Sequence, residues 1–467
     1  MSEAQSNSGQ TVAVIGGGIA GMAAACALAE SGYRVHLVER RGYLGGRASS
    51  YLHPGVGETI DNCQHALFGC CTNLRAFYRR LGVQKKIHWT SRMTMIEPGG
   101  RRSVLAPSPL PAPLHGVPRL LSASAFSAAD KLSLVRAFSA ILLGGAVDSN
   151  ESLASWLGRH HQSAGAIDRF WRLVIASALN SDLDQIGMNY ASMVIRGLFM
   201  DSAEAGQMGM STVPLSQLYT AVPESLSARG GAVYLNNGVD GAAYDTASRQ
   251  WTIYTRTGEI LADSVILALP FEAVQKLLPH LPPEEGREHL ARQIERHQHW
   301  PICSVHLWFD RPITDLEHAV LLDRQMHWMY NQSLLQSRPG NYVELVVSAS
   351  RAFAALGRQE AIALALKELA EFFPEVKSAR LEKFALVKEV HATFGVPPGI
   401  DSARPSAESP WPQLFLAGDW IQTHWPSTME SAARSGHLAA EALTLASGDP
   451  HSFLAADLAP RGMMRWL

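Results

Sequence analysis

The sequence has few cysteines, no excess of positive charge and no long apolar run. Its five cysteines form no Cys-x-x-Cys pair, which fits free thiols in a reducing compartment and offers no zinc-ligand spacing. The formal net charge is −2, so the chain lacks the basic surface on which nucleic-acid binding depends. These absences predict neither a metal site nor a nucleic-acid partner.

No stretch reaches the ~18 uninterrupted apolar residues that a membrane span requires. The most apolar segment, LSLVRAFSAILLGGAV from Leu132, is interrupted by Arg136. The first ten residues are polar, so we expect no secretory signal. A chain of 467 residues with 47% hydrophobic and 18% charged residues is predicted to be globular, with two domains or one elaborated domain. We therefore expect a cytoplasmic protein that at most lies on a membrane surface.

A glycine-rich motif near the start predicts a dinucleotide-binding turn. Residues 12–15 are apolar and predict a buried parallel strand, and a helix of small residues follows Gly16, Gly18 and Gly21 in the spacing G-x-G-x-x-G. The first glycine suits the tight turn, the second lets a pyrophosphate approach the backbone, and the third lets the helix pack on the strand. The helix N-terminus then offers donors to the phosphates.

The residues after the second predicted strand favour FAD. Glu39 ends that strand, about 20 residues after the glycines, where an acid accepts hydrogen bonds from ribose hydroxyls and disfavours NADP. The continuation from Arg40, RRGYLGGR, places Gly46 and Arg47 directly beyond it. A glycine admits close backbone approach, and the guanidinium offers a planar fork to phosphate oxygens. An exposed basic loop is the alternative interpretation of this segment.

The remaining elements predict a discontinuous α/β architecture. Helical spacing begins at residue 127 and recurs as one amphipathic helix over 351–373, whereas alternation predicts strands at 251–255, 265–268, 302–309 and 341–348. We expect a Rossmann-like FAD-binding domain carrying an inserted mixed α+β substrate-binding domain. The expected FAD-binding segments are 10–85, 210–275 and 395–446, the substrate-binding segments are 86–209 and 276–394, and the C-terminal tail is 447–467.

The order of these motifs resembles the FAD-containing amine oxidase and phytoene desaturase superfamily. The resemblance rests on the glycine motif with Glu39, the Gly-Gly-Arg loop, the block around Val239, and the terminal LFLAGDW…MESA…SG. It covers nearly the whole chain. Within the superfamily, the segments GETIDNCQH (57–65), ALN (178–180), HLWFDRP (306–312) and GDW (418–420) resemble the squalene-associated flavoproteins, the hydroxysqualene dehydroxylases of bacterial hopanoid pathways.

The resemblance implies a role for particular residues around a non-covalently bound FAD. It assigns Glu39 to the adenosine ribose, Arg47 to the pyrophosphate side, Val239 to the adenine, Asp419 to the ribityl-pyrophosphate, and the helix from Met429 to the flavin edge. Gly418 is also expected to bind the cofactor. No cysteine lies in the C-terminal segment, so the covalent linkage of some amine oxidases is not expected. This chain departs from the family pattern at Cys63, and at His424 and Trp425, so the pocket near the flavin is expected to differ in shape.

The implied reaction is the reductive dehydroxylation of hydroxysqualene to squalene. It requires a dry slot, a proton donor and a surface that tolerates transient positive charge. His65 and His424 are the candidate donors, because an unperturbed histidine titrates near working pH, and His65 is favoured because it lies in the family-like loop. Trp420 and Trp425 are candidates for stabilising the cation. Structural hydrogen bonding and packing are the alternative roles for all four residues.

Other functions of the same fold remain open from the sequence. A carotenoid-type polyene desaturase and an amine oxidase would use the same cofactor motifs, whereas the intact FAD motifs argue against a non-enzymatic prenyl-binding escort. A long apolar isoprenoid substrate implies association with the inner face of the cytoplasmic membrane. The candidate segments are 132–147 and LAPRGMMRWL at the C-terminus, with packing against the protein itself as the alternative. No second dinucleotide motif is present, so the electron donor is expected to be external and is not identified.

Overall fold

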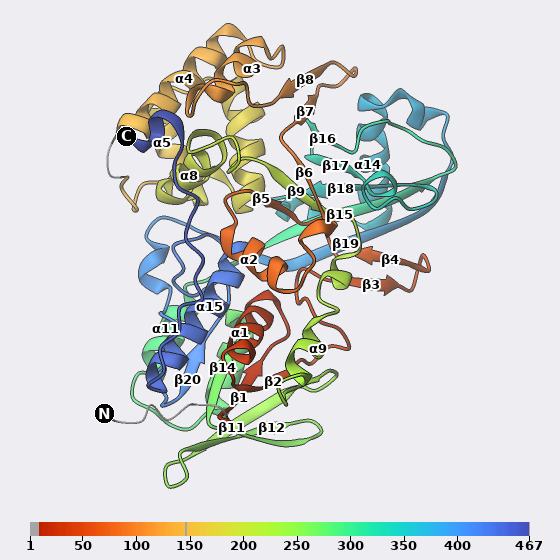
Figure 1. Cartoon of the computed structure of the whole chain (residues 1–467). Helices are drawn as coiled ribbons and strands as arrows, with labels where there is room; N and C mark the ends of the chain where they lie inside the picture. The colour runs from red at the N-terminus through yellow and green to blue at the C-terminus, as the bar shows by residue number, and fades with distance from the viewer. Residues whose placement is uncertain (1–8, 145–146, 467) are drawn as a thin grey trace.

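The computed structural model describes residues 9–144 and 147–466. Residues 145–146 and 467, which belong to the two candidate membrane segments, lie outside the described residues. The chain forms a parallel sheet at one end, a larger mixed sheet at the other, and a helical region beside the mixed sheet (Figure 1). This arrangement confirms the predicted α/β fold with an inserted mixed α+β region.

A five-stranded parallel sheet forms the core of the nucleotide-binding half. Its order is β10-β2-β1-β14-β20, with β1 (Thr11–Ile15), β2 (Arg34–Val38), β10 (Ala232–Tyr234), β14 (Ser264–Leu267) and β20 (Leu414–Leu416). The strands come from all three expected FAD-binding segments. Helices α1 (Ile19–Glu30) and α15 (Met429–Ala446) pack closely together, since a Cβ on Gly436 would lie 2.2 Å from the Ala20 carbonyl oxygen.

A seven-stranded sheet forms the second half. Its order is β19-β15-β18-β17-β16-β7-β8, in which β7 and β16 pair in parallel and the other neighbours are antiparallel. The bounds are β7 (Met93–Ile96), β8 (Arg102–Leu105), β15 (His299–Phe309), β16 (His318–Leu321), β17 (Trp328–Asn331), β18 (Asn341–Val347) and β19 (Leu381–Phe394). Helix α14 (Arg358–Phe372) covers one face through alternating apolar residues such as Val305 and Leu307. The opposite face of the sheet borders the cavity described in the next subsection.

The remaining strands of the described residues form three smaller sheets. The short sheets contain β3 (Ser50–His53) with β4 (Glu58–Asp61), β5 (Ala66–Phe68) with β9 (Met208–Ser211) and β6 (Ile87–Thr90), and β11 (Val239–Asp245) with β12 (Gln250–Thr255) and β13 (Gly258–Ala262). The other helices are α2 (Thr72–Arg80), α3 (Val117–Ser122), α4 (Ala128–Leu143), α5 (Leu153–Arg159), α6 (Ala164–Ala166), α7 (Ser177–Leu179), α8 (Met188–Ile195), α9 (Val222–Ser227), α10 (Phe271–Leu277), α11 (Arg287–Glu295), α12 (Gln332–Leu335) and α13 (Arg351–Ala355). Residues 167–176 and 196–200 are π-helical. None of the described helices is long and apolar enough to cross a membrane.

The expectation of one helix over 351–373 is wrong. The segment divides into α13 and α14, because Leu356 and Gly357 adopt extended conformations and Gly357 becomes the N-cap of α14. Strand β19 was not expected at all. Its burial does not alternate along its length, so the period of two that marks a half-buried strand is absent from its sequence.

Candidate active site

One cavity runs between the parallel sheet and the seven-stranded sheet. Its volume is about 1510 Å³, larger than the ~300–1,000 Å³ typical of a pocket for one small ligand. Gly16, Glu39 and Gly418 line it, and they follow the carboxyl ends of β1, β2 and β20. Open parallel sheets bind ligands at this end. The cavity therefore has room for a dinucleotide cofactor together with a substrate.

The glycine turn after β1 leaves space for a pyrophosphate. Gly16 has a φ of 112°, and a Cβ there would lie 2.3 Å from the Ala268 carbonyl oxygen. A Cβ on Gly21 would lie 1.9 Å from the Gly16 carbonyl oxygen, so α1 packs tightly on the strand end. By contrast, a Cβ on Gly18 would meet nothing within 4 Å, because this N-cap of α1 borders the cavity. The helix N-terminus is thus open to phosphate oxygens.

Glu39 is fixed beside this turn by backbone hydrogen bonds. Its buried carboxylate accepts from the backbone N–H groups of Gly17 (2.7 Å) and Arg41 (2.8 Å). Each carboxylate oxygen retains a further lone pair for a ribose hydroxyl. The carboxylate therefore has the position and the acceptor capacity that ribose binding requires.

Arg47 and Asp419 form an ion pair on the cavity wall. Asp419 also accepts a hydrogen bond from the Ser427 hydroxyl, and Arg47 donates to the Ala392 carbonyl oxygen at 3.0 Å. Burial opposes ionisation of Asp419, yet Arg47 and Ser427 hold the pKa of its carboxyl below the ordinary value. A guanidinium has five N–H donors, so Arg47 can hold Asp419 and phosphate oxygens at the same time.

The N-terminus of α15 also opens onto the cavity. Thr428 caps the helix by accepting from the Ser431 backbone N–H at 3.2 Å, and both Thr428 and Met429 line the cavity. The positive end of the helix dipole therefore faces the cavity, where it would stabilise a negative charge on a bound ligand. The predicted cofactor residues that line the cavity are Gly16, Gly18, Glu39, Arg40, Gly46, Arg47, Val239, Gly418, Asp419 and Met429. Gly21 instead serves the packing of α1.

Arg404, which the sequence analysis missed, holds the turn after β20. Its buried guanidinium donates to the backbone carbonyl oxygens of Asp419, Ile421 and Trp425 at 2.6–3.0 Å. A single side chain thus satisfies the carbonyl groups of a tight turn that carries three large side chains. Only the folded structure reveals this role, because Arg404 is distant in sequence from the residues that it binds.

The three large side chains of that turn, Trp420, His424 and Trp425, lie in different environments. Trp420 is fully buried in the core, donates to the Leu269 carbonyl oxygen at 2.9 Å and lies outside the cavity lining. This placement does not agree with its predicted cation-stabilising role. His424 is exposed at the cavity, with a φ of 59°. Trp425 lines the cavity, but the Arg434 guanidinium lies 4.9 Å from its ring centroid, so it already stacks with one cation.

His65 lies in the cavity wall as a neutral imidazole. Its Nδ1 is 2.7 Å from the Cys63 carbonyl oxygen, and a carbonyl can only accept, so the proton resides on Nδ1 and Nε2 remains an acceptor. Desolvation lowers the pKa of His65 to about 4, although the hydrogen bond to Cys63 opposes this shift. Burial thus moves the pKa of His65 below the neutral range in which an unperturbed histidine titrates.

The part of the cavity beneath the seven-stranded sheet is lined mainly by apolar side chains, with Ser177, Asn180 and Ser348 among its polar residues. Ile302, Trp328, Tyr330 and Val346 line it from the sheet, with Val174, Ala178, Met193 and Val194 from the helical region. Asn62 also lines the cavity, but its Oδ1 is buried and has no hydrogen-bond partner among the described residues. The slot is thus suited to a long, mainly apolar ligand.

A buried polar network supports the loop that carries Asn62 and His65. Glu344 on β18 accepts from the Gln64 backbone N–H at 2.6 Å and from Gln332 Nε2 at 2.7 Å. The Ser304 hydroxyl donates to the Asn62 carbonyl oxygen at 3.0 Å. Burial, together with the charge of Asp61, raises the pKa of Glu344 to about 8. The sequence did not point to these residues, since they lie on interior strands among apolar neighbours.

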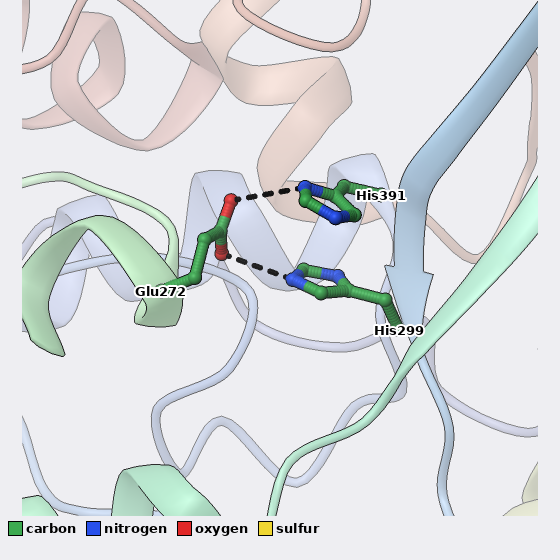
Figure 2. A group of neighbouring side chains, drawn as sticks. All are labelled: Glu272, His299 and His391. Carbon is green, nitrogen blue, oxygen red and sulfur yellow. Dashed lines mark ion pairs between the residues drawn. The ribbon is translucent and has the colours of Figure 1, made fainter.

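A carboxylate and two histidines meet on another part of the wall (Figure 2). Glu272 lies 3.3 Å from His299 and 3.9 Å from His391, and the two imidazole rings stack with centroids 4.0 Å apart and planes 13° apart. The lone pair of each ring nitrogen lies in the plane of its ring. Because the two ring planes are nearly parallel, these lone pairs point in parallel toward the carboxylate, whereas binding one metal ion would require them to point at the same position. The geometry is that of two histidines competing for one carboxylate.

Comparison with known proteins identifies the family. The family model described as flavin containing amine oxidoreductase matches residues 19–444. The chain belongs to this family. A 15-cis-phytoene desaturase from Synechococcus elongatus is 26% identical, with 92% of this chain and 95% of the relative covered. An oxidoreductase from Methanosarcina mazei has the same fold, with a TM-score of 0.72 at 17% identity over 91% of this chain and 98% of that one.

A second solved structure has the same fold. Putrescine oxidase bound to putrescine superposes with a TM-score of 0.70 at 16% identity, over 94% of this chain and 98% of that one. The match shows a shared fold. The protein is an FAD-dependent oxidoreductase, and the cavity residues described above fit this cofactor.

Proposed function

We propose that this flavoprotein reduces hydroxysqualene to squalene. The observation that carries the proposal is the mainly apolar slot with the free Nε2 acceptor of His65 beside the FAD-binding residues. A long hydrocarbon with one hydroxyl would fill the slot, and its single O–H would donate to His65 Nε2. The resemblance of residues 57–65 to the squalene-associated flavoproteins supports the same assignment.

The chain's own residues would bind, orient and protonate the substrate. The chemistry that bound, reduced FAD would supply is a hydride for the new C–H bond, while the allylic C–O bond breaks and the protonated hydroxyl leaves as water. The apolar wall excludes bulk water from the resulting charge separation. His65 would position the hydroxyl, and in its protonated form would donate the proton to the leaving oxygen. With a pKa of about 4, that form is about one in a thousand at pH 7.

Polyene desaturation is the second candidate. The phytoene desaturase relative covers nearly the whole chain, and a polyene would also fit the apolar slot. In that reaction a neutral His65 would accept a proton, as its lowered pKa permits. Amine oxidation, the third possibility considered from the sequence, is not favoured by the apolar lining of the slot.

The direction of the reaction can be measured in one experiment. We expect the pre-reduced, oxygen-free enzyme to be reoxidised by hydroxysqualene, with one squalene formed for each flavin. If no reoxidation occurs and the oxidised enzyme is instead reduced by 15-cis-phytoene, the proposal is wrong and desaturation replaces it.

His65 can be tested within the same assay. The variant His65→Ala should lose turnover while retaining bound flavin. The matched control is His289→Ala, because His289 is exposed and lies outside the cavity lining. Turnover of His65→Ala equal to that of the control would contradict a role in the reaction.

A further inference from the structure

Two segments far apart in the sequence form one face of the helical region. The C-terminal tail runs from α15 toward α4 and α5 and ends beside them (Figure 1). Its last turn, Gly462–Arg465, is anchored by the Met463 backbone N–H, which donates to the Ala112 carbonyl oxygen at 2.9 Å. Met464 is buried in the same core cluster as Ala112. We call the surface formed by residues 110–143 and 461–466 the helical face.

Exposed apolar side chains are concentrated on this face. Of the sixteen large hydrophobic side chains that are exposed among the described residues, eight belong to it: Leu110, Leu114, Leu121, Leu132, Val135, Leu143, Met463 and Trp466. A cluster of this kind on a water-soluble surface marks an interaction site. Half of the exposed large hydrophobic side chains thus lie in two short segments.

Helix α4 shows the same feature at the level of one element. Leu134, Ala137 and Ile141 face the core, as in any amphipathic helix. The opposite stripe, however, contains Leu132 and Leu143, which are 62% and 73% exposed. A helix that is apolar on both sides is normally covered on both sides. The outer stripe of α4 therefore lacks its covering.

The charges around these side chains are positive. Arg119, Arg136 and Arg465 are exposed within the two segments. The single acid, Asp130, is buried and bonded to Ser127 in a capping box. Basic residues beside an exposed apolar stripe are typical of surfaces that bind anionic lipids. A second copy of this chain would bring the same positive charges into contact with each other.

The tail also connects the helical face to the cavity. Leu454 and Leu458 line the cavity. The Arg461 backbone N–H then donates at 2.8 Å to the carbonyl oxygen of Asp201, another cavity residue. The tail continues to Trp466, which is 88% exposed, and tryptophan prefers the boundary between lipid and water. An apolar ligand leaving a bilayer at this face would be close to the cavity.

We propose that the helical face docks the protein on an anionic lipid bilayer, with Leu132, Leu143 and Trp466 inserted among the lipids. The proposal rests on the surface alone and does not depend on the reaction catalysed. The sequence suggested two separate candidate segments for membrane association, and in the proposal they act together as one surface.

Flotation of the FAD-loaded protein with liposomes tests the proposal. The protein should float with vesicles of equal parts phosphatidylcholine and phosphatidylglycerol, and less with phosphatidylcholine alone or at high salt. Leu132→Ser/Leu143→Ser and, separately, Trp466→Ala should reduce flotation severalfold while retaining flavin. The matched control is Leu52→Ser/Leu261→Ser, since these leucines are 67% and 59% exposed elsewhere.

Three results would overturn the proposal. The first is the absence of flotation with the anionic vesicles, and the second is flotation reduced equally by the control pair. The third is sedimentation of the wild type as a dimer that Leu132→Ser/Leu143→Ser converts into a monomer, which would make the helical face a contact between two copies of the chain.

Discussion

Replacing Glu344 with glutamine should change how the stability of the protein depends on pH. The carboxyl group is fully buried on β18 and supports the Gln64 backbone in the cavity wall. Burial is the main reason that its pKa rises to about 8, and the charge of Asp61 adds to the effect, while the hydrogen bonds from Gln64 and Gln332 oppose it. In the folded protein the neutral acid is therefore favoured.

The magnitude follows from linkage between protonation and folding. A pKa raised from 4.5 to about 8 corresponds to about 5 kcal/mol between the two protonation states. Because the unfolded chain ionises at the lower pKa, this group does not affect stability below about pH 4.5. It lowers the free energy of unfolding progressively up to about pH 8, and the loss is complete above that value. Glutamine does not titrate, so Glu344→Gln lacks this loss.

Chemical unfolding of the FAD-loaded protein, followed over a pH series from about 5 to about 9, measures the effect. Glutamine also presents an N–H₂ group toward Gln332, which adds a pH-independent cost of about 1–3 kcal/mol. The prediction therefore concerns the slope: wild type should lose stability relative to the variant as pH rises. The matched control, Glu382→Gln, alters an exposed carboxyl. Parallel curves for wild type and Glu344→Gln would refute the reasoning.

Three further predictions concern the cofactor site. Asp419→Asn removes the charge that pairs with Arg47 and should weaken FAD binding at least tenfold in a flavin-fluorescence titration. Gly18→Val should fold, as judged by circular dichroism, but purify without flavin, because its side chain would enter the space open to phosphates. Arg404→Met should lower stability by about 3–5 kcal/mol in thermal unfolding, since it leaves several buried carbonyl groups unpaired.

The cofactor-binding residues near the N-terminus could be predicted from the sequence because their interactions involve residues close to one another in the chain. Gly16, Gly18 and Gly21 belong to a single strand–turn–helix unit. Their spacing alone predicts where the backbone turns and where the absence of a side chain is required. Glu39 bonds to Gly17, which is part of that same unit. The fingerprint therefore predicts both the fold and the position of the ligand.

The catalytic half could not be predicted because its properties arise from packing between distant segments. The lowered pKa of His65 comes from desolvation, and Trp420 is directed into the core by its bond to Leu269. The roles of Arg404 and Glu344 depend on partners that only the fold brings near. Residue type and spacing do not show how deeply an individual polar side chain is buried or which long-range hydrogen bonds it makes.

The pKa of His65 provides a way to separate the two proposed reactions. Above a pKa of about 4, the protonated fraction of an imidazole falls tenfold for each pH unit. If protonated His65 donates to the leaving hydroxyl, the single-turnover rate of hydroxysqualene reduction should fall nearly tenfold per unit across the neutral range. If neutral His65 accepts a proton during desaturation, the rate should be flat there, because the neutral form is already dominant. A flat profile for hydroxysqualene reduction would mean that His65 only orients the hydroxyl and that the proton reaches the oxygen from another group.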